Sequence, residues 1–184
     1  MEGLTRLNGH TDVEELVVLL DERLRPVGTA PKAEVHTTTT PLHLAFSCYV
    51  FDDSGRLLLS RRAPGKRAWP GVWTNSFCGH PAPGEQMADA VTRRARRELG
   101  LGLAELRMVL PDFRYRAVAA DGVVENEFCP VWTARAVGEP QPAADEVSEW
   151  RWVPWTDLLL VAERMPFLLS PWAQLQISEL AVAG

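Results

Sequence analysis

Two short stretches of the chain combine residue types that bind metal ions or carry protons. Cys78 and His80 lie two apart in the stretch NSFCGHP. The spacing leaves three interpretations open: half of a zinc site, a nucleophile with its base, or a core cysteine beside an unrelated histidine. A decision among them needs the rest of the chain.

Glu125 and Glu127 also lie two apart, in a stretch with strand character, so both carboxylates point to the same face. On a buried face the two carboxylates repel each other, and a metal ion or a shared proton relieves that repulsion. Histidine nitrogens beside two carboxylates suit a first-row metal such as Mn, Fe or Zn. On an exposed face the same pair is an ordinary solvated surface.

The composition is that of a folded protein with an acidic balance. The chain has 184 residues, of which 46% are hydrophobic and 23% charged, enough for one hydrophobic core. The net charge of −5 argues against a nucleic-acid partner. Three cysteines without paired spacing, a polar N-terminus and no long apolar run indicate a cytoplasmic protein without a membrane partner.

The elements that position these residues follow from apolar periodicity and from glycine and proline. We expect an α+β fold with a mixed β-sheet flanked by helices, as one domain over 13–184 after a flexible tail at 1–12. The expected strands are 15–20, the hairpin 43–52 and 57–62, 72–78, the hairpin 113–120 and 123–137, and 148–155. A helix is expected over 85–99, and two more between 156 and 182, with a loop at 63–71.

The segment from Gly79 to Leu101 resembles the Nudix box, a loop–helix–loop pattern that presents acidic side chains to metal ions on a diphosphate. The matching residues are Gly79, Glu85, Arg93, Glu98 and Gly100. Arg94 and Arg97 stand where that pattern has glutamates, and the second position normally supplies a catalytic metal ligand. Plain diphosphate hydrolysis therefore does not follow from this box. An amphipathic helix with exposed arginines is the alternative interpretation.

Basic and aromatic residues complete the candidates. The stretch SRRAPGKRAWPG carries four cations, and Lys32 precedes His36. Such a cluster in an acidic protein is suited to phosphate, although each cation alone is equally well explained as solvated. Trp172 begins a helix, where tryptophan is usually part of the core. It gains a chemical role if a bound apolar group becomes cationic, because an indole face stabilises a cation.

Together these stretches resemble the type I isopentenyl-diphosphate Δ-isomerases, non-hydrolysing relatives of the Nudix enzymes. The resemblance covers about residues 30–177 and rests on seven strings in order: KAEVHTTTTPLHLAFS, RRAPGKRAWPGVWTN, FCGHP, RRARRELG, PDFRYRA, VENEFCPV and SPW. It implies a Nudix-type fold and the interconversion of isopentenyl diphosphate and dimethylallyl diphosphate. In that reaction the alkene is protonated, a tertiary carbocation forms, and a proton leaves from the other side.

The resemblance also implies roles for individual residues. A metal site for Mn²⁺, with Zn²⁺ as an alternative, consists of His36, His43, His80, Glu125 and Glu127. A Mg²⁺ ion is held by Glu98 and the main-chain carbonyl of Cys78. The diphosphate contacts are Lys32, Arg62, Lys66 and Arg94. Proton transfer involves Cys78, Glu127 and Tyr115, and Trp172 faces the hydrocarbon end.

The resemblance does not assign the direction of proton transfer. We expect Glu127 or Tyr115 to protonate and Cys78 to deprotonate in the forward direction. Two other classes of function stay open from the residues alone. They are a Nudix hydrolase of nucleoside or prenyl diphosphates, and a non-catalytic module that binds a metal or a ligand. A monomer acting on a small-molecule substrate is expected.

Overall fold

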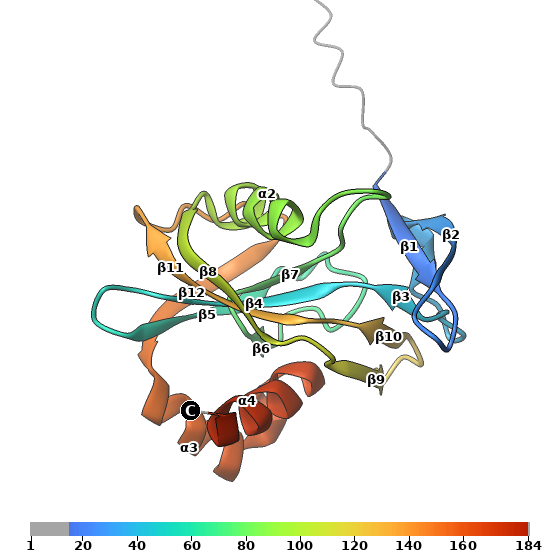
Figure 1. Cartoon of the computed structure of the whole chain (residues 1–184). Helices are drawn as coiled ribbons and strands as arrows, with labels where there is room; N and C mark the ends of the chain where they lie inside the picture. The colour runs from blue at the N-terminus through green and yellow to red at the C-terminus, as the bar shows by residue number, and fades with distance from the viewer. Residues whose placement is uncertain (1–14, 184) are drawn as a thin grey trace, which may run out of the picture.

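The computed structural model describes residues 15–183, in which the strands form two sheets (Figure 1). The predicted tail at 1–12 lies outside the described residues, so the division into a tail and a domain stays a prediction. The first sheet has the order β2 (Pro26–Pro31), β1 (Leu16–Leu20), β3 (His43–Leu44), β10 (Val124–Phe128), β9 (Arg114–Val118). The second has the order β12 (Val147–Pro154), β5 (Arg56–Arg62), β4 (Phe46–Phe51), β11 (Val131–Val137), β8 (Gly102–Leu110). Two short strands, β6 (Trp73–Thr74) and β7 (Phe77–Gly79), pair with β5 and β4.

Two chain segments run side by side through both sheets. β3 pairs in parallel with β10 in the first sheet. Each segment then has a short break, and their continuations β4 and β11 pair in parallel in the second sheet. The Ala45 N–H donates to the Phe128 carbonyl at 2.9 Å, which holds the two segments together where they leave the first sheet. The expected single strand at 123–137 was therefore wrong in extent. Pro130 has no N–H to continue a ladder, and the chain changes sheets there.

Helices cover the two faces of the second sheet. α2 (Met87–Leu99) lies on one face, and α3 (Trp155–Arg164) and α4 (Pro171–Ala183) lie on the other, joined by the 3-10 turn η1 (Pro166–Leu168) (Figure 1). Side chains of β4 alternate between these layers, since Phe46 and Val50 pack in the α2 core and Tyr49 in the α3–α4 core. The expected mixed sheet flanked by helices is confirmed. Within residues 15–183, no helix is long and apolar enough to cross a membrane.

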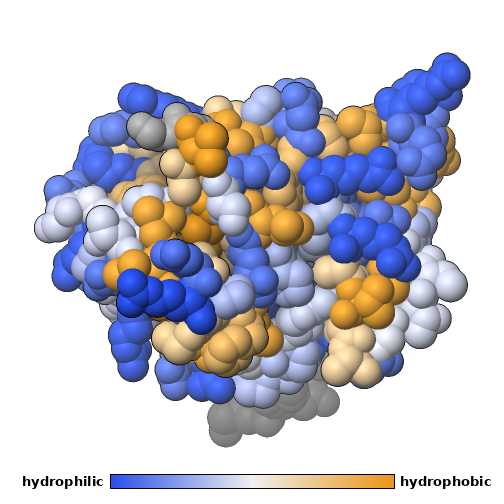
Figure 2. Space-filling view, turned by 90° about the horizontal axis from the view of Figure 1, so that it is seen from below, coloured by the Kyte–Doolittle hydropathy of each residue, from blue (hydrophilic) through white to orange (hydrophobic). Residues whose placement is uncertain are grey.

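The α3–α4 layer has an apolar inner face and an outer face on which apolar and polar residues are mixed. Figure 2 views the molecule from this side and shows hydrophobic patches among hydrophilic residues. The layer buries Leu158, Trp172, Ala173 and Ile177 against the sheet. Leu160, Phe167, Leu168 and Leu175 are exposed. The other buried residues of this layer pack around Trp172 and hold it in place at the start of α4.

α2 is fixed at both ends by residues of the Nudix-like segment. It begins at Met87, two residues later than expected, so Glu85 lies in the preceding loop. The Glu85 carboxylate accepts from Nε and Nη2 of Arg93, each at 2.7 Å, and thereby ties the loop to the helix. Gly100 ends the helix at φ 64°, a left-handed conformation that glycine adopts without strain.

Several elements were not expected from the sequence. The predicted strand at 72–78 is interrupted at Asn75 and Ser76, whose buried side chains bond to neighbouring main chain. β2, the one-turn helix α1 (Lys32–Val35) and β8 were not predicted. β8 is an edge strand with irregular pairing to β11, and it is half-exposed, so it shows no clear apolar alternation.

Candidate active site

Three histidines and two glutamates converge where α1, β3, β7 and β10 meet. His36, His43 and His80 have ring centroids 5.2 to 5.9 Å apart. Glu127 Oε1 lies 3.1 Å from His80 Nε2 and 3.4 Å from His43 Nε2. Glu125 Oε2 lies 3.1 Å from His36 Nε2. Candidate ligand atoms of four of the five predicted residues, all but Glu125, lie within 4.8 Å of one another, and Glu125 adjoins this group through His36.

The donor set of this cluster fits a metal ion. Four of its buried polar atoms make no aligned hydrogen bond, although three of them lie within 3.4 Å of an oppositely charged or polar neighbour: His36 Nε2, His43 Nε2, His80 Nδ1 and Glu125 Oε2. His43 Nδ1 lies 3.0 Å from the Pro41 carbonyl, which can only accept, so Nδ1 carries the hydrogen and, in the neutral ring, Nε2 keeps a free lone pair. Unpaired buried atoms of this kind are costly in a protein without a ligand. Nitrogen and carboxylate donors together suit Mn or Zn.

Burial also sets the charge states of the cluster. Burial lowers the pKa of His80 to about 3, so the ring is neutral and able to bind a metal at neutral pH. Burial raises the pKa of Glu125, and the neighbouring charge of Glu127 raises it further. Because two carboxylates share one low-dielectric site, a divalent cation would stabilise both in their charged forms.

A cavity of about 720 Å³ opens beside this cluster. One end of the cavity, which we call the reacting end because the predicted proton carriers lie there, is lined by Cys78, Tyr115, Glu127 and Trp172. The four predicted diphosphate contacts also line the cavity: Lys32, Arg62, Lys66 and Arg94. One cavity therefore has a cationic part and a part bordered by a thiol, a phenol and an indole.

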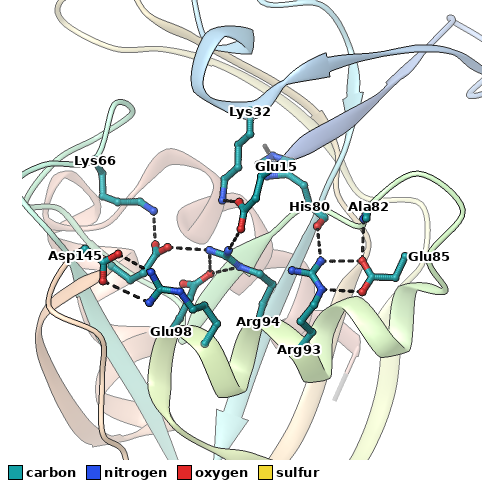
Figure 3. Close-up of polar contacts among 12 residues, drawn as sticks. Glu15, Lys32, Lys66, His80, Ala82, Glu85, Arg93, Arg94, Glu98 and Asp145 are labelled. Carbon is teal, nitrogen blue, oxygen red and sulfur yellow. Dashed lines mark hydrogen bonds and ion pairs between the residues drawn. The ribbon is translucent and has the colours of Figure 1, made fainter. Parts of the chain in front are cut away.

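The cationic part is an ion-pair network centred on Arg94 (Figure 3). Arg94 is buried and pairs with Glu98 at 2.5 Å and with Glu15 and Glu146 at 3.0 Å each. Although burial opposes the charge of Arg94, these carboxylates raise the pKa of its guanidinium. Lys32 pairs with Glu15 at 2.5 Å. This network places carboxylates on three of the four predicted diphosphate contacts, since Lys66 also pairs with Glu146.

Gly79 sets how closely α2 approaches the cavity. A Cβ atom on Gly79 would lie 2.8 Å from Arg94 Cγ and 2.8 Å from Phe46 Cζ. Only glycine allows the buried Arg94 side chain to pass over β7 and reach the cavity. Glu98, predicted to bind Mg²⁺, lies buried on the next turn and does not line the cavity itself. Arg97, the other replaced glutamate position, is exposed and pairs with Asp145 at 2.7 Å.

The residues predicted to carry protons have defined partners. The Tyr115 O–H donates to Glu127 Oε2 at 2.9 Å. Burial raises the pKa of Cys78 to about 12, so its thiol is neutral at physiological pH. Trp172 is buried, and its ring lies 5.8 Å from that of Tyr115. Arg62 Cζ lies 5.4 Å from the centre of the Trp172 ring, so the indole adjoins the cationic part as well.

Four residues at this site were missed by the sequence analysis: Glu15, Ser47, Asn75 and Glu146. Glu15 and Glu146 reach the network from positions 79 and 52 residues away from Arg94, and no local pattern marks such partners. Asn75 and Ser47 bond to the Cys78 thiol. A polar residue inside the apolar stretch VWTNSFC was the available signal for Asn75.

The fold and the ordered sequence matches define the class of this protein. The NUDIX domain family matches residues 41–174. The structure of DR0079 from Deinococcus radiodurans aligns with a TM-score of 0.62 at 22% identity, covering 82% of this chain and 90% of that one. The protein is thus a member of the NUDIX domain family.

Full-length relatives narrow the class. An isopentenyl-diphosphate Delta-isomerase of Mycolicibacterium vanbaalenii is 63% identical over 174 residues, which are 95% of this chain and 96% of the relative. One of Frankia alni is 59% identical over 173 residues, 94% of this chain and 89% of the relative. The chain belongs to the isopentenyl-diphosphate Δ-isomerase family.

Proposed function

We propose that the protein interconverts isopentenyl diphosphate and dimethylallyl diphosphate through a tertiary carbocation. The observation that carries this proposal is the two-part cavity. Its cationic part suits a diphosphate, and its other part, bordered by Cys78, Glu127 and Trp172, suits a small hydrocarbon that gains and loses a proton. An ordinary anion-binding pocket has no need of the second part.

Anchoring of the diphosphate is assigned to Lys32, Arg62, Lys66 and Arg94. All of these cations except Arg62 pair with the carboxylates Glu15, Glu98 and Glu146, so the four cations exceed the three carboxylates by one charge. A diphosphate carries more negative charge than this small excess can balance. A Mg²⁺ ion held by Glu98 and the main-chain carbonyl of Cys78 would supply the remaining positive charge. Because the diphosphate lies far from the double bond, its binding energy serves to orient the hydrocarbon part of the substrate.

The His36, His43, His80, Glu125 and Glu127 cluster is proposed to hold Mn²⁺, with Zn²⁺ as the alternative. When bound, the ion lowers the proton affinity of its carboxylate ligands and of groups bonded to them. The supporting observations are the four buried atoms without an aligned hydrogen bond and the fixed tautomer of His43.

Proton transfer is assigned to groups at the end of the cavity away from the cationic part. Tyr115 or Glu127 gives a proton to the terminal CH₂ of the alkene, and the positive charge moves to the tertiary carbon. Cys78 then accepts a proton from the carbon next to the CH₂O group, and the double bond forms there. This step requires the thiolate form of Cys78, although burial raises the pKa of the thiol to about 12 in the ligand-free protein. One proton is gained and one is lost, so the substrate's charge is unchanged. The hydrogen bond between Tyr115 and Glu127 supports a shared proton on that side.

Exclusion of water is assigned to aromatic side chains. A tertiary carbocation reacts with water to give an alcohol, so its site must be shielded. Trp172 lies 5.6 Å from Trp69 and 5.8 Å from Tyr115, ring centre to ring centre. These rings support an enclosed hydrocarbon end, and the indole face stabilises positive charge.

Incubation with isopentenyl diphosphate and Mg²⁺ plus Mn²⁺ tests the proposal by ¹H NMR. Dimethylallyl diphosphate should form without release of phosphate. Phosphate release without the isomer would indicate a hydrolase, and binding without conversion would indicate a ligand-binding module. We also propose that the protein is cytoplasmic, which its three unpaired cysteines support. We further propose that it is a monomer, which analytical ultracentrifugation would test.

A further inference from the structure

Asn75 is fully buried at the break between β6 and β7, and its side chain contacts two residues of the reacting end. We propose that Asn75 is a positioning residue, which holds the Cys78 thiol and the Trp172 indole at the hydrocarbon end of the cavity. This inference rests on the proposed isomerase function and adds a residue that neither touches the substrate nor binds a metal.

The orientation of the Asn75 amide is fixed by its donor side. Asn75 Nδ2 donates to the main-chain carbonyls of Phe77 at 2.7 Å and of Cys48 at 3.1 Å. Both partners can only accept, so the NH₂ group must face them and Oδ1 must face the opposite side. The side chain therefore has one possible orientation.

The oxygen of the same amide serves the reacting end. Asn75 Oδ1 accepts from Trp172 Nε1 at 3.1 Å and from Cys78 Sγ at 3.3 Å. An indole N–H can only donate, and this bond fixes the rotation of the ring. Thr74 Oγ1 donates to the same oxygen at 2.8 Å. A single carbonyl oxygen thus sets the relative positions of the thiol and of the indole face.

Cys78 has a second polar partner that does not reach Trp172. Ser47 Oγ lies 3.3 Å from Cys78 Sγ and is itself held by Gln176 Nε2 at 2.9 Å. Ser47 therefore orients the Cys78 thiol without contacting the indole. Among the described hydrogen bonds, those of Asn75 are the ones that join Cys78 to Trp172, so loss of Asn75 should uncouple the two.

The variants Asn75→Ala and Ser76→Ala test this role as a matched pair. Ser76 is the next residue, equally buried, and its hydroxyl bonds only to the main chain of Val50 and Leu58. Both variants lose buried hydrogen bonds and should lower the melting temperature. Asn75→Ala should also lower kcat by about 100-fold, the scale of a misplaced reacting group. Its affinity for inorganic pyrophosphate with Mg²⁺ should stay within about twofold of wild type.

Two further variants separate positioning from folding. Asn75→Asp keeps the accepting oxygen and, as the protonated acid that burial favours, one donor toward the Phe77 carbonyl, so it should recover part of the lost kcat. Trp172→Phe removes the N–H donor together with the five-membered ring that carries it, and should lower kcat by about tenfold. Since the two changes remove the same bond, the double variant Asn75→Ala/Trp172→Phe should lose less kcat than the two single losses multiplied.

The outcomes are distinct. Equal kcat in Asn75→Ala and Ser76→Ala, or strictly multiplicative losses, would overturn the inference and leave the proposed function intact. If Asn75→Ala does not fold, wild-type kcat in Trp172→Phe would overturn it instead. A wild-type protein without isomerase turnover would overturn both.

Discussion

The Tyr115 hydroxyl donates to one oxygen of the Glu127 carboxylate at 2.9 Å, while the other oxygen faces His80 at 3.1 Å. Glu127 is thereby the side chain through which the histidine cluster and a phenol act on each other. A charge held in the cluster alters the proton affinity of Glu127 and, through the hydrogen bond, that of Tyr115. We therefore propose that metal binding and proton transfer are coupled at this one carboxylate.

Tyr115→Phe tests the coupling, because it removes the hydroxyl and keeps the ring beside Trp172. We expect kcat to fall by about 10²-fold, since loss of a positioned acid–base group costs that much. KM should change little, because the diphosphate contacts are untouched. Phe113→Leu, in the same core but without a hydroxyl, is the control. Wild-type kcat in Tyr115→Phe would exclude the phenol from proton transfer.

His80→Gln tests the metal site. The variant should lose bound metal and activity together, because it removes a nitrogen ligand from a cluster of three histidines. Metal content is measured after dialysis against Mn²⁺. In wild type, Mn²⁺ at about 100 times its Kd should raise the melting temperature by about 5–10 °C, and the variant should show a much smaller rise.

Glu149→Gln removes a carboxylate from the surface of β12 and is the control for that experiment. It should bind as much metal as wild type. Unchanged metal content in His80→Gln would contradict the assignment of this histidine as a ligand.

Glu15→Gln tests the cationic network. The Glu15 carboxylate pairs with Lys32 and Arg94, which we assign to the diphosphate, and these cations lower its pKa to about 2 against the effect of burial. The neutral variant leaves both cations available. Its affinity for inorganic pyrophosphate with Mg²⁺ should rise by about threefold, a modest gain because Glu15 is half-exposed.

Isothermal titration measures that affinity, with Glu22→Gln as the control. Glu22 pairs with Arg114, which does not line the cavity. Weaker binding in Glu15→Gln would mean that Glu15 orients Lys32 and Arg94 for the ligand rather than competing with it.

Gly79→Ala tests the close packing of α2 over β7. The new methyl group would lie 2.8 Å from both Arg94 Cγ and Phe46 Cζ, so one of them must move. Overpacking of this kind destabilises a protein by about 1–3 kcal/mol. Gly28→Ala, on β2, meets no atom within 4 Å and should change stability by less than about 0.5 kcal/mol. Equal urea midpoints for the two variants would contradict the packing argument.

The sequence predicted features that depend on local periodicity. The apolar stripe and Gly100 predicted the helix that ends at Leu99, and two-residue alternation predicted that Glu125 and Glu127 share a face. Both are confirmed, because helix and strand periods are properties of neighbouring residues. The gathering of His36, His43 and His80 followed only from the family resemblance, since three separate elements supply them.

Features set by long-range contacts were not predictable. The switch of the chain between sheets at Pro130 depends on which strands pair, and alternation does not specify partners. The carboxylates of Glu15 and Glu146 meet Arg94 only after the fold has formed. Asn75 lies at an interruption of a strand, and its partners Cys48 and Trp172 are 27 and 97 residues away.

Solvent deuterium incorporation tests the central claim most directly. The protein is incubated in D₂O with isopentenyl diphosphate, Mg²⁺ and Mn²⁺, and both isomers are examined by ²H NMR and mass spectrometry. The account predicts deuterium in the methyl group of dimethylallyl diphosphate, with loss of the label in Glu127→Gln at retained pyrophosphate binding. Metal-loaded wild-type protein that forms no labelled product, or Glu127→Gln that labels it as fast as wild type, would contradict the account.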